Sequence, residues 1–265
     1  KAPEQKRDET DEETIERMRQ RFDILTDMTK ATKRGDVRAM IVSGPPGVGK
    51  SFGVEQVLEK YNTLSTLGNT APKYEVVKGA MSPIGLYSKL YNFQNKDNVL
   101  VFDDCDSILL DDLSLNILKA ALDSKKVRRI CWNTDSHTLR REGVPNQFEF
   151  AGSVIFITNI KFDNVKSKKL RDHLEALESR CHYIDLTIDT LREKLLRIDQ
   201  IVKDGMLSEY AFTPETHAAI VAWIKAHARR LREVSLRTVL KVSDLAKAFP
   251  DTWPAMATNT VLRPV

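Results

Sequence analysis

One octapeptide constrains this chain more than any other stretch. Residues 44–51 read Gly-Pro-Pro-Gly-Val-Gly-Lys-Ser and complete the pattern G-x-x-x-x-G-K-[ST]. The preceding residues 38–43 predict a short buried strand, and residues 52–60 predict a helix. The glycines therefore lie in a strand-to-helix turn, which is the context that a chance match lacks. The alternative is a glycine-rich turn with an incidental lysine, and the flanking elements argue against it.

A turn of this kind can bind phosphate. Its glycines let the backbone N–H groups converge on the β-phosphate, together with the positive end of the following helix. Lys50 would reach the β- and γ-phosphates, and the Ser51 hydroxyl would ligate Mg²⁺. The predicted cofactors are therefore ATP and Mg²⁺. The residues predicted to hold them here are Gly44, Pro45, Pro46, Gly47, Val48, Gly49, Lys50, Ser51 and Phe52.

Length and composition place the chain among globular proteins. Its 265 residues, 42% of them hydrophobic, suffice for one large or two small domains. No apolar run approaches the roughly 18 residues that a membrane span needs, and no charged-then-apolar stretch resembles a secretory signal, so we expect a cytoplasmic protein without a membrane partner. Cys105, Cys131 and Cys181 lack the spacing of a metal site or a disulfide framework. The net charge of +4 permits an anionic partner.

The distribution of apolar residues predicts two folded parts. Residues 1–14 predict a disordered polar tail, and residues 15–187 hold an amphipathic helix followed by alternating strands and helices. This alternation predicts a parallel sheet sandwiched by helices. Residues 188–250 predict only helices, and residues 251–265, which contain two prolines and directly follow Pro250, predict an irregular tail. Strands are expected at 74–77, 98–102, 153–158 and 182–186, and helices at 82–91, 111–123, 189–203 and 235–248, with another starting at 213.

Two further strand ends carry polar side chains suited to the same site. The apolar run that ends at Phe102 delivers Asp103 and Asp104, of which the first would hold the metal and the second would polarise the attacking water. A solvated acidic turn is the alternative for this pair. Asn159 follows the strand at 153–158, where its amide can hydrogen-bond both the water and the γ-phosphate. Without the other motifs it would be a plain turn residue.

These motifs together resemble the AAA+ ATPases over about residues 20–248. Residues 44–51 resemble the family's Walker A, residues 99–104 its Walker B, and Thr158-Asn159 its sensor 1. The resemblance implies a RecA-like P-loop NTPase sheet followed by a small all-α lid, with ATP in the crevice between them. It also implies ATP hydrolysis by a homo-oligomeric ring, six subunits by analogy with the family. Most members carry Glu where this chain has Asp104, which is one methylene shorter. The expected consequence is either a displaced carboxylate with slow turnover or a neighbouring group that shares its task.

Two arginines extend the resemblance. Ser179-Arg180-Cys181 resembles the Ser-Arg-Cys motif of clamp loaders, whose arginine reaches the γ-phosphate of the neighbouring subunit. Arg180 is therefore the predicted arginine finger, and Arg171 is its rival. Residues 232–238 resemble the sensor 2 region, which would place Arg237 over the nucleotide, with Arg232 as second choice. For each arginine the alternative is a surface salt bridge.

Two segments are candidates for contact with a substrate. The loop after the second strand corresponds to the channel-lining loop of ring-shaped members, but it lacks their aromatic residue. Met81 could grip an apolar segment there, and Lys78 could follow a phosphate backbone. A plain loop leading into a capped helix explains these residues equally well.

Residues 124–151 predict a hairpin inserted before the sensor 1 strand. Its basic residues suit a phosphate backbone, and Trp132 could stack on bases or belong to the hairpin's own core. The leading hypothesis is therefore a motor, loader or remodeller that acts on DNA or RNA. The alternatives are a remodeller of a partner protein and a slow nucleotide-dependent assembly scaffold. The basic candidates on the hairpin are Lys125, Lys126, Arg128 and Arg129.

Overall fold

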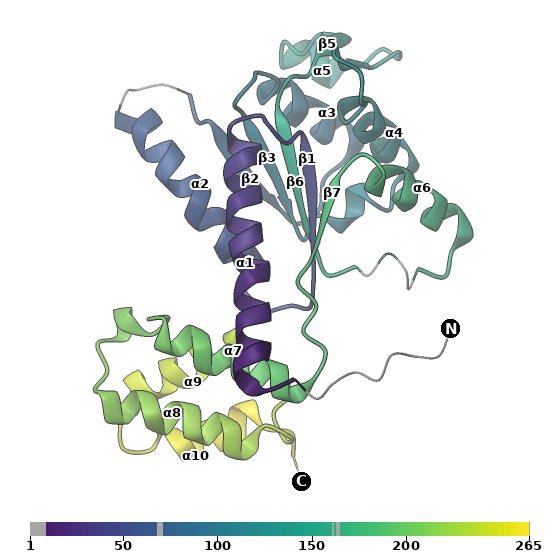
Figure 1. The fold of residues 1–265 in the computed structure, drawn as a ribbon. Coiled ribbons are helices and arrows are strands. Elements are labelled where there is room, and N and C mark those ends of the chain that lie inside the picture. The colour runs from purple at the N-terminus through teal and green to yellow at the C-terminus, as the bar shows by residue number, and fades with distance from the viewer. Residues whose placement is uncertain (1–8, 68–70, 161, 163–164, 265) are drawn as a thin grey trace. The chain divides into compact units, whose positions relative to one another are not determined.

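The computed structural model describes residues 9–67, 71–160, 162 and 165–264. They fall into two compact units, whose elements are labelled in Figure 1. The sheet unit comprises Arg21–Gly44 and Lys50–Leu186. The helical unit comprises the segment that ends at Gln20, the loop Pro45–Gly49 and the segment that begins at Thr187. Among the described residues, none of the helices combines the length and apolar character that a membrane crossing requires.

Five parallel strands form the sheet, as the alternation of elements predicts. Their order is β2-β3-β6-β1-β7. Ser43 pairs with Thr158, and Asp103 pairs with Ile157, so the strands that carry the predicted site end at nearly the same level. The strands are β1 (Ala39–Ser43), β2 (Tyr74–Lys78), β3 (Val99–Asp103), β6 (Ser153–Thr158) and β7 (His182–Asp185). The α/β fold class with a parallel sheet between helices is thus confirmed.

Helices cover both faces of this sheet, which explains why its central strands are apolar at every position. Met40 and Val42 join one core cluster, whereas Ala39 and Ile41 join the other, because alternate residues of a strand face opposite sides. The second half of α1 and helix α2 contribute to the first cluster through Leu25 and Val54. The other cluster receives α3, α4 and α6. The bounds are α1 (Asp11–Lys33), α2 (Lys50–Leu67), α3 (Pro83–Asn92), α4 (Asp112–Ala121) and α6 (Lys168–Glu178), with a 3₁₀ turn η1 (Asp106–Ile108).

The insertion before β6 is a small antiparallel ribbon. Strands β4 (Arg129–Cys131) and β5 (Gln147–Glu149) pair with Ile130 opposite Phe148, and a short helix α5 (His137–Arg141) lies between them. Both apolar residues are buried. The ring of Phe148 lies 5.1 Å from that of Tyr87 in α3, and the Trp132 ring lies 5.6 Å from the same tyrosine. The insertion is therefore anchored to the sheet unit by an aromatic cluster.

The helical unit packs around its own apolar core. Ile198, Ile224 and Val239, from three different helices, are essentially inaccessible. Thr213 caps one of these helices by accepting a hydrogen bond from Thr216 N, and Pro214 occupies its first turn. The helices are α7 (Leu191–Lys203), α8 (Pro214–His227), α9 (Leu236–Ala248) and α10 (Trp253–Val261), with a 3₁₀ turn η3 (Ser208–Tyr210).

The structure corrects the predictions for both ends of the chain. The irregular tail predicted at 251–265 is wrong, because α10 occupies most of it and buries Trp253. Pro254 lies in the first turn of α10, where a missing N–H costs nothing. The polar tail predicted at 1–14 is also wrong in its last residues, since α1 begins at Asp11. There Thr10 and Glu13 exchange backbone-to-side-chain hydrogen bonds of 2.9 and 3.2 Å, which is the capping box that the prediction overlooks. Residues 1–8 and 265 of these tails lie outside the described residues.

Candidate nucleotide-binding site

The glycine loop, residues 44–51, connects β1 to α2. Gly47 and Gly49 have φ of 71° and 102°, backbone conformations that residues with a Cβ rarely adopt. Helix α2 begins at Lys50 and has no acidic residue in its first turn. Its N–H groups and its positive end are therefore not offset by a nearby carboxylate of that turn, which favours an anion beside the loop.

The Lys50 side chain is buried in the sheet unit, at the carboxyl ends of the strands. It is only 6% exposed. Its Nζ donates hydrogen bonds of 2.6 Å to the Gly44 carbonyl and 2.8 Å to Asn159 Oδ1. Two residues separated by 109 positions, each singled out by a different motif, thus meet directly.

Ser51 and Asp103 form the second contact of the site. The Ser51 hydroxyl donates a hydrogen bond of 2.9 Å to Asp103 Oδ1, and Asp103 is buried at the end of β3. The Lys78 ammonium lies 3.3 Å from Asp103 Oδ2 and 2.8 Å from Glu55 Oε1. The hydrogen bond to Glu55, and then that to Asp103, raises the pKa of Lys78. Lys78, a predicted substrate contact, therefore carries its charge at the edge of this site.

The oxygen donors fit Mg²⁺. A hydroxyl and a carboxylate already 2.9 Å apart are hard ligands of the kind that Mg²⁺ prefers. No group of three or more His, Cys, Asp or Glu side chains that could hold a metal occurs among the residues that the structure describes. This is compatible with Mg²⁺, which is commonly held by one or two carboxylates, substrate phosphates and water rather than by an all-protein cage.

Asp104 and Asn159 complete the arrangement. Asn159 Nδ2 donates a hydrogen bond of 2.8 Å to Asp104 Oδ1, so the amide joins Lys50 to the carboxylate. Asp104 is exposed and has φ of 50°, in the left-handed region. Thr158 Oγ1, at the end of β6, donates a hydrogen bond of 2.8 Å to Asp106 Oδ1, which ties β6 to the 3₁₀ turn η1 that follows β3. The Thr158–Asp106 pair is not predicted from the sequence, because the two residues lie 52 positions apart and no motif links them.

No family model matches this chain. A 36.7 kDa protein encoded in the nrdC-mobD intergenic region of Enterobacteria phage T4 is 35% identical to it over 254 residues, which cover 95% of this chain and 76% of the phage protein. The chain belongs to the family of this phage T4 protein. Membership of this phage T4 family carries no activity with it, so the chemistry rests on the site.

Several solved structures are similar in fold to this chain at low sequence identity. Domain III of the Thermotoga maritima replication initiation protein DnaA is 10% identical and has a TM-score of 0.48, with 92% of this chain and 91% of that chain covered. The Aeropyrum pernix ORC1 protein in complex with DNA is 12% identical and has a TM-score of 0.46, with 93% of this chain and 62% of that chain covered. Saccharomyces cerevisiae Hsp104 in its casein complex is 16% identical and has a TM-score of 0.45, with 89% of this chain and 39% of that chain covered. The chain thus spans less than two thirds of the ORC1 and Hsp104 chains, and TM-scores below 0.5 decide nothing about function.

Arg180 lies far from Lys50 and the other site residues at the carboxyl ends of the strands. It precedes β7, whose first residue pairs with Met40 near the start of β1, whereas Lys50 follows the end of β1. Since a residue of a strand rises about 3.3 Å, the two ends of β1 are separated by more than about 10 Å. The Arg180 guanidinium donates to the Ala176 carbonyl and lines a cavity of about 480 Å³ at the amino-terminal edge of the sheet. Its rival Arg171 donates instead to the Val165 carbonyl, at 2.7 Å.

Arg237 belongs to the helical unit, as does the glycine-loop segment Pro45–Gly49. Leu236 N donates a hydrogen bond of 2.9 Å to the Gly47 carbonyl. A Cβ on Gly47 would lie 2.6 Å from the Ser235 Cβ, so glycine is needed there for close approach as well. Arg237 is the next residue of α9 and is exposed, as is Arg232.

The other predicted substrate contacts differ in exposure. Lys125 and Lys126 are exposed. Arg128 is only 6% exposed, and Arg129 pairs with Glu149 at 3.1 Å. Met81 packs partly buried against the core of the sheet unit, and its N–H donates to Ser107 Oγ at 3.2 Å. Trp132 packs against that core as well, on Tyr87.

Proposed function

We propose that this chain is an ATPase of the AAA+ type, which binds ATP with Mg²⁺ through the glycine loop and hydrolyses it. The observation that carries the proposal is the chain of contacts from Lys50 through Asn159 to Asp104. It lies where the carboxyl ends of parallel strands meet, which is where open α/β sheets bind nucleotides.

Each side chain has a distinct task in the proposed reaction. Lys50 exchanges its present acceptors for the oxygens of the β- and γ-phosphates. Ser51 and Asp103 would hold Mg²⁺, which would supply charge neutralisation at the phosphates. Asp104 accepts a hydrogen bond from the attacking water and so orients its lone pair toward the γ-phosphorus. Asn159 keeps the Asp104 carboxylate in place through the bond of 2.8 Å between Nδ2 and Oδ1.

The proposed arginine finger acts between copies of the chain. Arg180 lies at the opposite edge of the sheet from Lys50, so it serves the γ-phosphate of a neighbouring protomer rather than its own. A head-to-tail contact forms a ring when the rotation between neighbours closes, and we propose a closed ring of six subunits by analogy with the AAA+ family.

A matched pair of α2 variants tests the proposal. Lys50→Ala should abolish turnover of ATP and weaken binding of a fluorescent ATP analogue, because the phosphates lose their main cation. Lys60→Ala removes the same charge from an exposed position of α2 and should leave both unchanged. Normal hydrolysis by the Lys50 variant would contradict the assignment of the glycine loop.

For the substrate, we propose a nucleic acid. The exposed Lys125 and Lys126 on the insertion support this choice, since charge supplies affinity for a phosphate backbone without sequence preference. Single-stranded DNA or RNA should then raise ATP turnover, and added salt should reduce the effect. Stimulation only by a protein would replace this proposal by a protein remodeller. Turnover that stays low while nucleotide drives assembly would favour a scaffold.

A further inference from the structure

A second cavity lies at the edge of the sheet opposite the proposed nucleotide site. Its volume is about 250 Å³. The residues around it precede or begin strands: Arg38 comes before β1, Lys96 before β3, Arg128 before β4, and Ser153 begins β6. All of them belong to the sheet unit.

The wall of this cavity contains a buried cation. Arg128 is 6% exposed, and its Cζ lies 5.1 Å from the centre of the Phe150 ring. Its guanidinium donates hydrogen bonds of 3.0 Å to the Ala121 carbonyl and 2.9 Å to the Gly152 carbonyl. These acceptors are neutral, and in the described part of the chain no carboxylate pairs with Arg128. Five N–H donors with two such bonds leave donors for a further acceptor.

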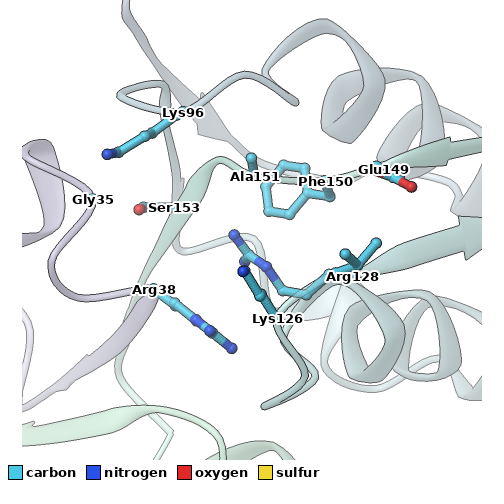
Figure 2. A pocket seen from close by; sticks show the side chains of 10 residues that line it. Gly35, Arg38, Lys96, Lys126, Arg128, Glu149, Phe150, Ala151 and Ser153 are labelled. Carbon is cyan, nitrogen blue, oxygen red and sulfur yellow. The ribbon is translucent and has the colours of Figure 1, made fainter.

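The charged group that shifts the pKa of Arg128 is a second cation, Arg38. Burial, and then the charge of Arg38, lowers the pKa of Arg128 to about 10. Arg38 itself donates two bonds of 3.0 Å to the backbone carbonyls of Asp123 and Lys125. Glu149 lies at the rim, but it pairs with Arg129 at 3.1 Å, and Figure 2 shows its side chain directed away from the Arg128 guanidinium.

Lys126 and Lys96 add two more cations to the lining, so four basic residues line one cavity. Figure 2 shows the Lys96 side chain directed away from the Arg128 guanidinium. Burying a guanidinium without a counter-charge costs free energy, and an anion in the cavity would offset that cost. Four cations in the lining set a positive potential that favours a group with more than one negative charge over a single carboxylate. A phosphate group, with several oxygens and up to two charges, matches this set of donors.

We propose that this cavity is an anion site that binds a phosphate group. The group is carried either by a nucleic-acid backbone or by a free phosphorylated small molecule, since both present the same oxygens. The site is distinct from the glycine loop and does not depend on ATP hydrolysis, because none of its lining residues belongs to residues 44–51.

Adjacent lysines provide a matched test. Lys126 lines the cavity and Lys125 does not, although both are exposed and carry the same charge. Inorganic phosphate is titrated into the full chain while the side-chain Nε–H signals of its arginines are followed by NMR. Arg38 and Arg128 are the arginines that line the cavity, and residues 44–51 contain none, so the Arg38 and Arg128 signals report on the cavity rather than on the loop. The Arg38 and Arg128 signals should shift with phosphate.

Phosphate should bind roughly fivefold more weakly to the Lys126→Gln and Lys96→Gln variants, and with unchanged affinity to Lys125→Gln. The unfolding midpoint of each variant verifies that it folds. Equal weakening by Lys125→Gln and Lys126→Gln, or absence of any shift at Arg128, would overturn the proposal. An oligothymidylate then identifies the source: if it competes with phosphate, the site takes a nucleic-acid backbone, and if it does not, the site takes a small phosphorylated molecule.

Discussion

Asp104 combines an unfavourable backbone conformation with a position at the proposed reaction centre. Its φ of 50° belongs to the left-handed region, which Asp and Asn tolerate better than other residues with a Cβ. Its N–H donates a hydrogen bond of 2.9 Å to the Ile157 carbonyl, which holds the turn in this conformation. Strain of this kind is retained where the surrounding structure fixes it, commonly at functional sites. In this backbone conformation the Asp104 carboxylate faces Asn159. The conformation of the turn can therefore compensate for the shorter side chain that Asp has compared with Glu.

The substitution Asp104→Asn tests the catalytic role of Asp104 apart from its effect on stability. Asn adopts the left-handed region as readily as Asp, so the free energy of unfolding should change by less than about 1 kcal/mol. The amide cannot accept a proton from water, and kcat should fall by about 100-fold or more, with the affinity for ATP retained. Turnover and binding of a fluorescent ATP analogue measure the two effects.

Asp104→Gly is the control for the backbone. Glycine removes the strain and the side chain together, so this variant should fold at least as stably as the parent while losing turnover to the same extent. If the Asn variant kept hydrolysis, the task of polarising water would pass to another carboxylate, with Asp106 the nearest along the chain.

At the scale of elements, the start of α7 depends on one carboxylate. Thr190 and Glu193 form a capping box, and Glu193 also accepts a hydrogen bond of 2.9 Å from Arg17 in the first half of α1. Burial alone would raise the pKa of Glu193. The hydrogen bonds from Thr190 and Arg17 outweigh it and lower the pKa to about 2. The ionised form therefore stabilises the folded helical unit.

Glu193→Gln should lower the free energy of unfolding by about 2 kcal/mol at pH 7. Because the folded pKa lies below the unfolded value near 4.5, the advantage of the parent is complete above pH 4.5. It should decline as the pH falls from there toward 2. Urea unfolding followed by helical circular dichroism at several pH values measures the difference. A difference that did not depend on pH would contradict the assigned role.

Glu215→Gln provides the comparison. Glu215 lies in the first turn of α8 in the same unit, and it is fully exposed and has no basic residue among the groups that shift its pKa. Its loss should therefore change stability less than the loss of Glu193. Similar losses at both positions would indicate a general helix-dipole effect rather than the contact with Arg17.

How far the sequence predicts these elements depends on the type of signal. The central strands are predictable because burial on both faces requires uninterrupted apolar runs, and polar residues at their ends mark the candidate site. Helix α6 is missed although Leu170, Leu174 and Leu177 follow helical spacing, because the basic run at its start dominates the pattern. Helix α10 is missed because its prolines are taken as breakers, although Pro254 stands in the first turn.

Charge runs are the least predictable feature. Arg128 and Arg129 are adjacent in a basic run, but one is buried beside Phe150 and the other is exposed and paired with Glu149. Alternate residues of an extended segment face opposite sides, so the run divides between a cavity and solvent. Lys78 likewise turns toward two carboxylates that lie 23 and 25 positions away in the chain. No local pattern contains such pairs.

At the scale of the whole molecule, the two edges of the sheet carry complementary halves of one proposed reaction. Lys50 and Asp104 lie at the carboxyl ends of the strands, and Arg180 lies at the amino end of β7. Arg180→Ala should therefore lose hydrolysis while keeping its affinity for ATP, and ATP should still promote assembly. Arg171→Ala, which removes a guanidinium held by the Val165 carbonyl, should keep both.

Mixing two inactive variants tests whether the arginine acts in trans. In a mixed ring of Lys50→Ala and Arg180→Ala chains, an interface is competent when the first variant donates Arg180 to the intact loop of the second. Random assembly of equal amounts makes about a quarter of the interfaces competent, so turnover should recover to at most about that fraction of the parent's. Dilution should abolish the recovery, because it separates the protomers. A mixture that stays inactive although both chains co-assemble, or a parent chain that is fully active as a monomer, would rule out Arg180 as an arginine finger, because Arg180 and Lys50 lie at opposite ends of the strands and cannot meet within one chain.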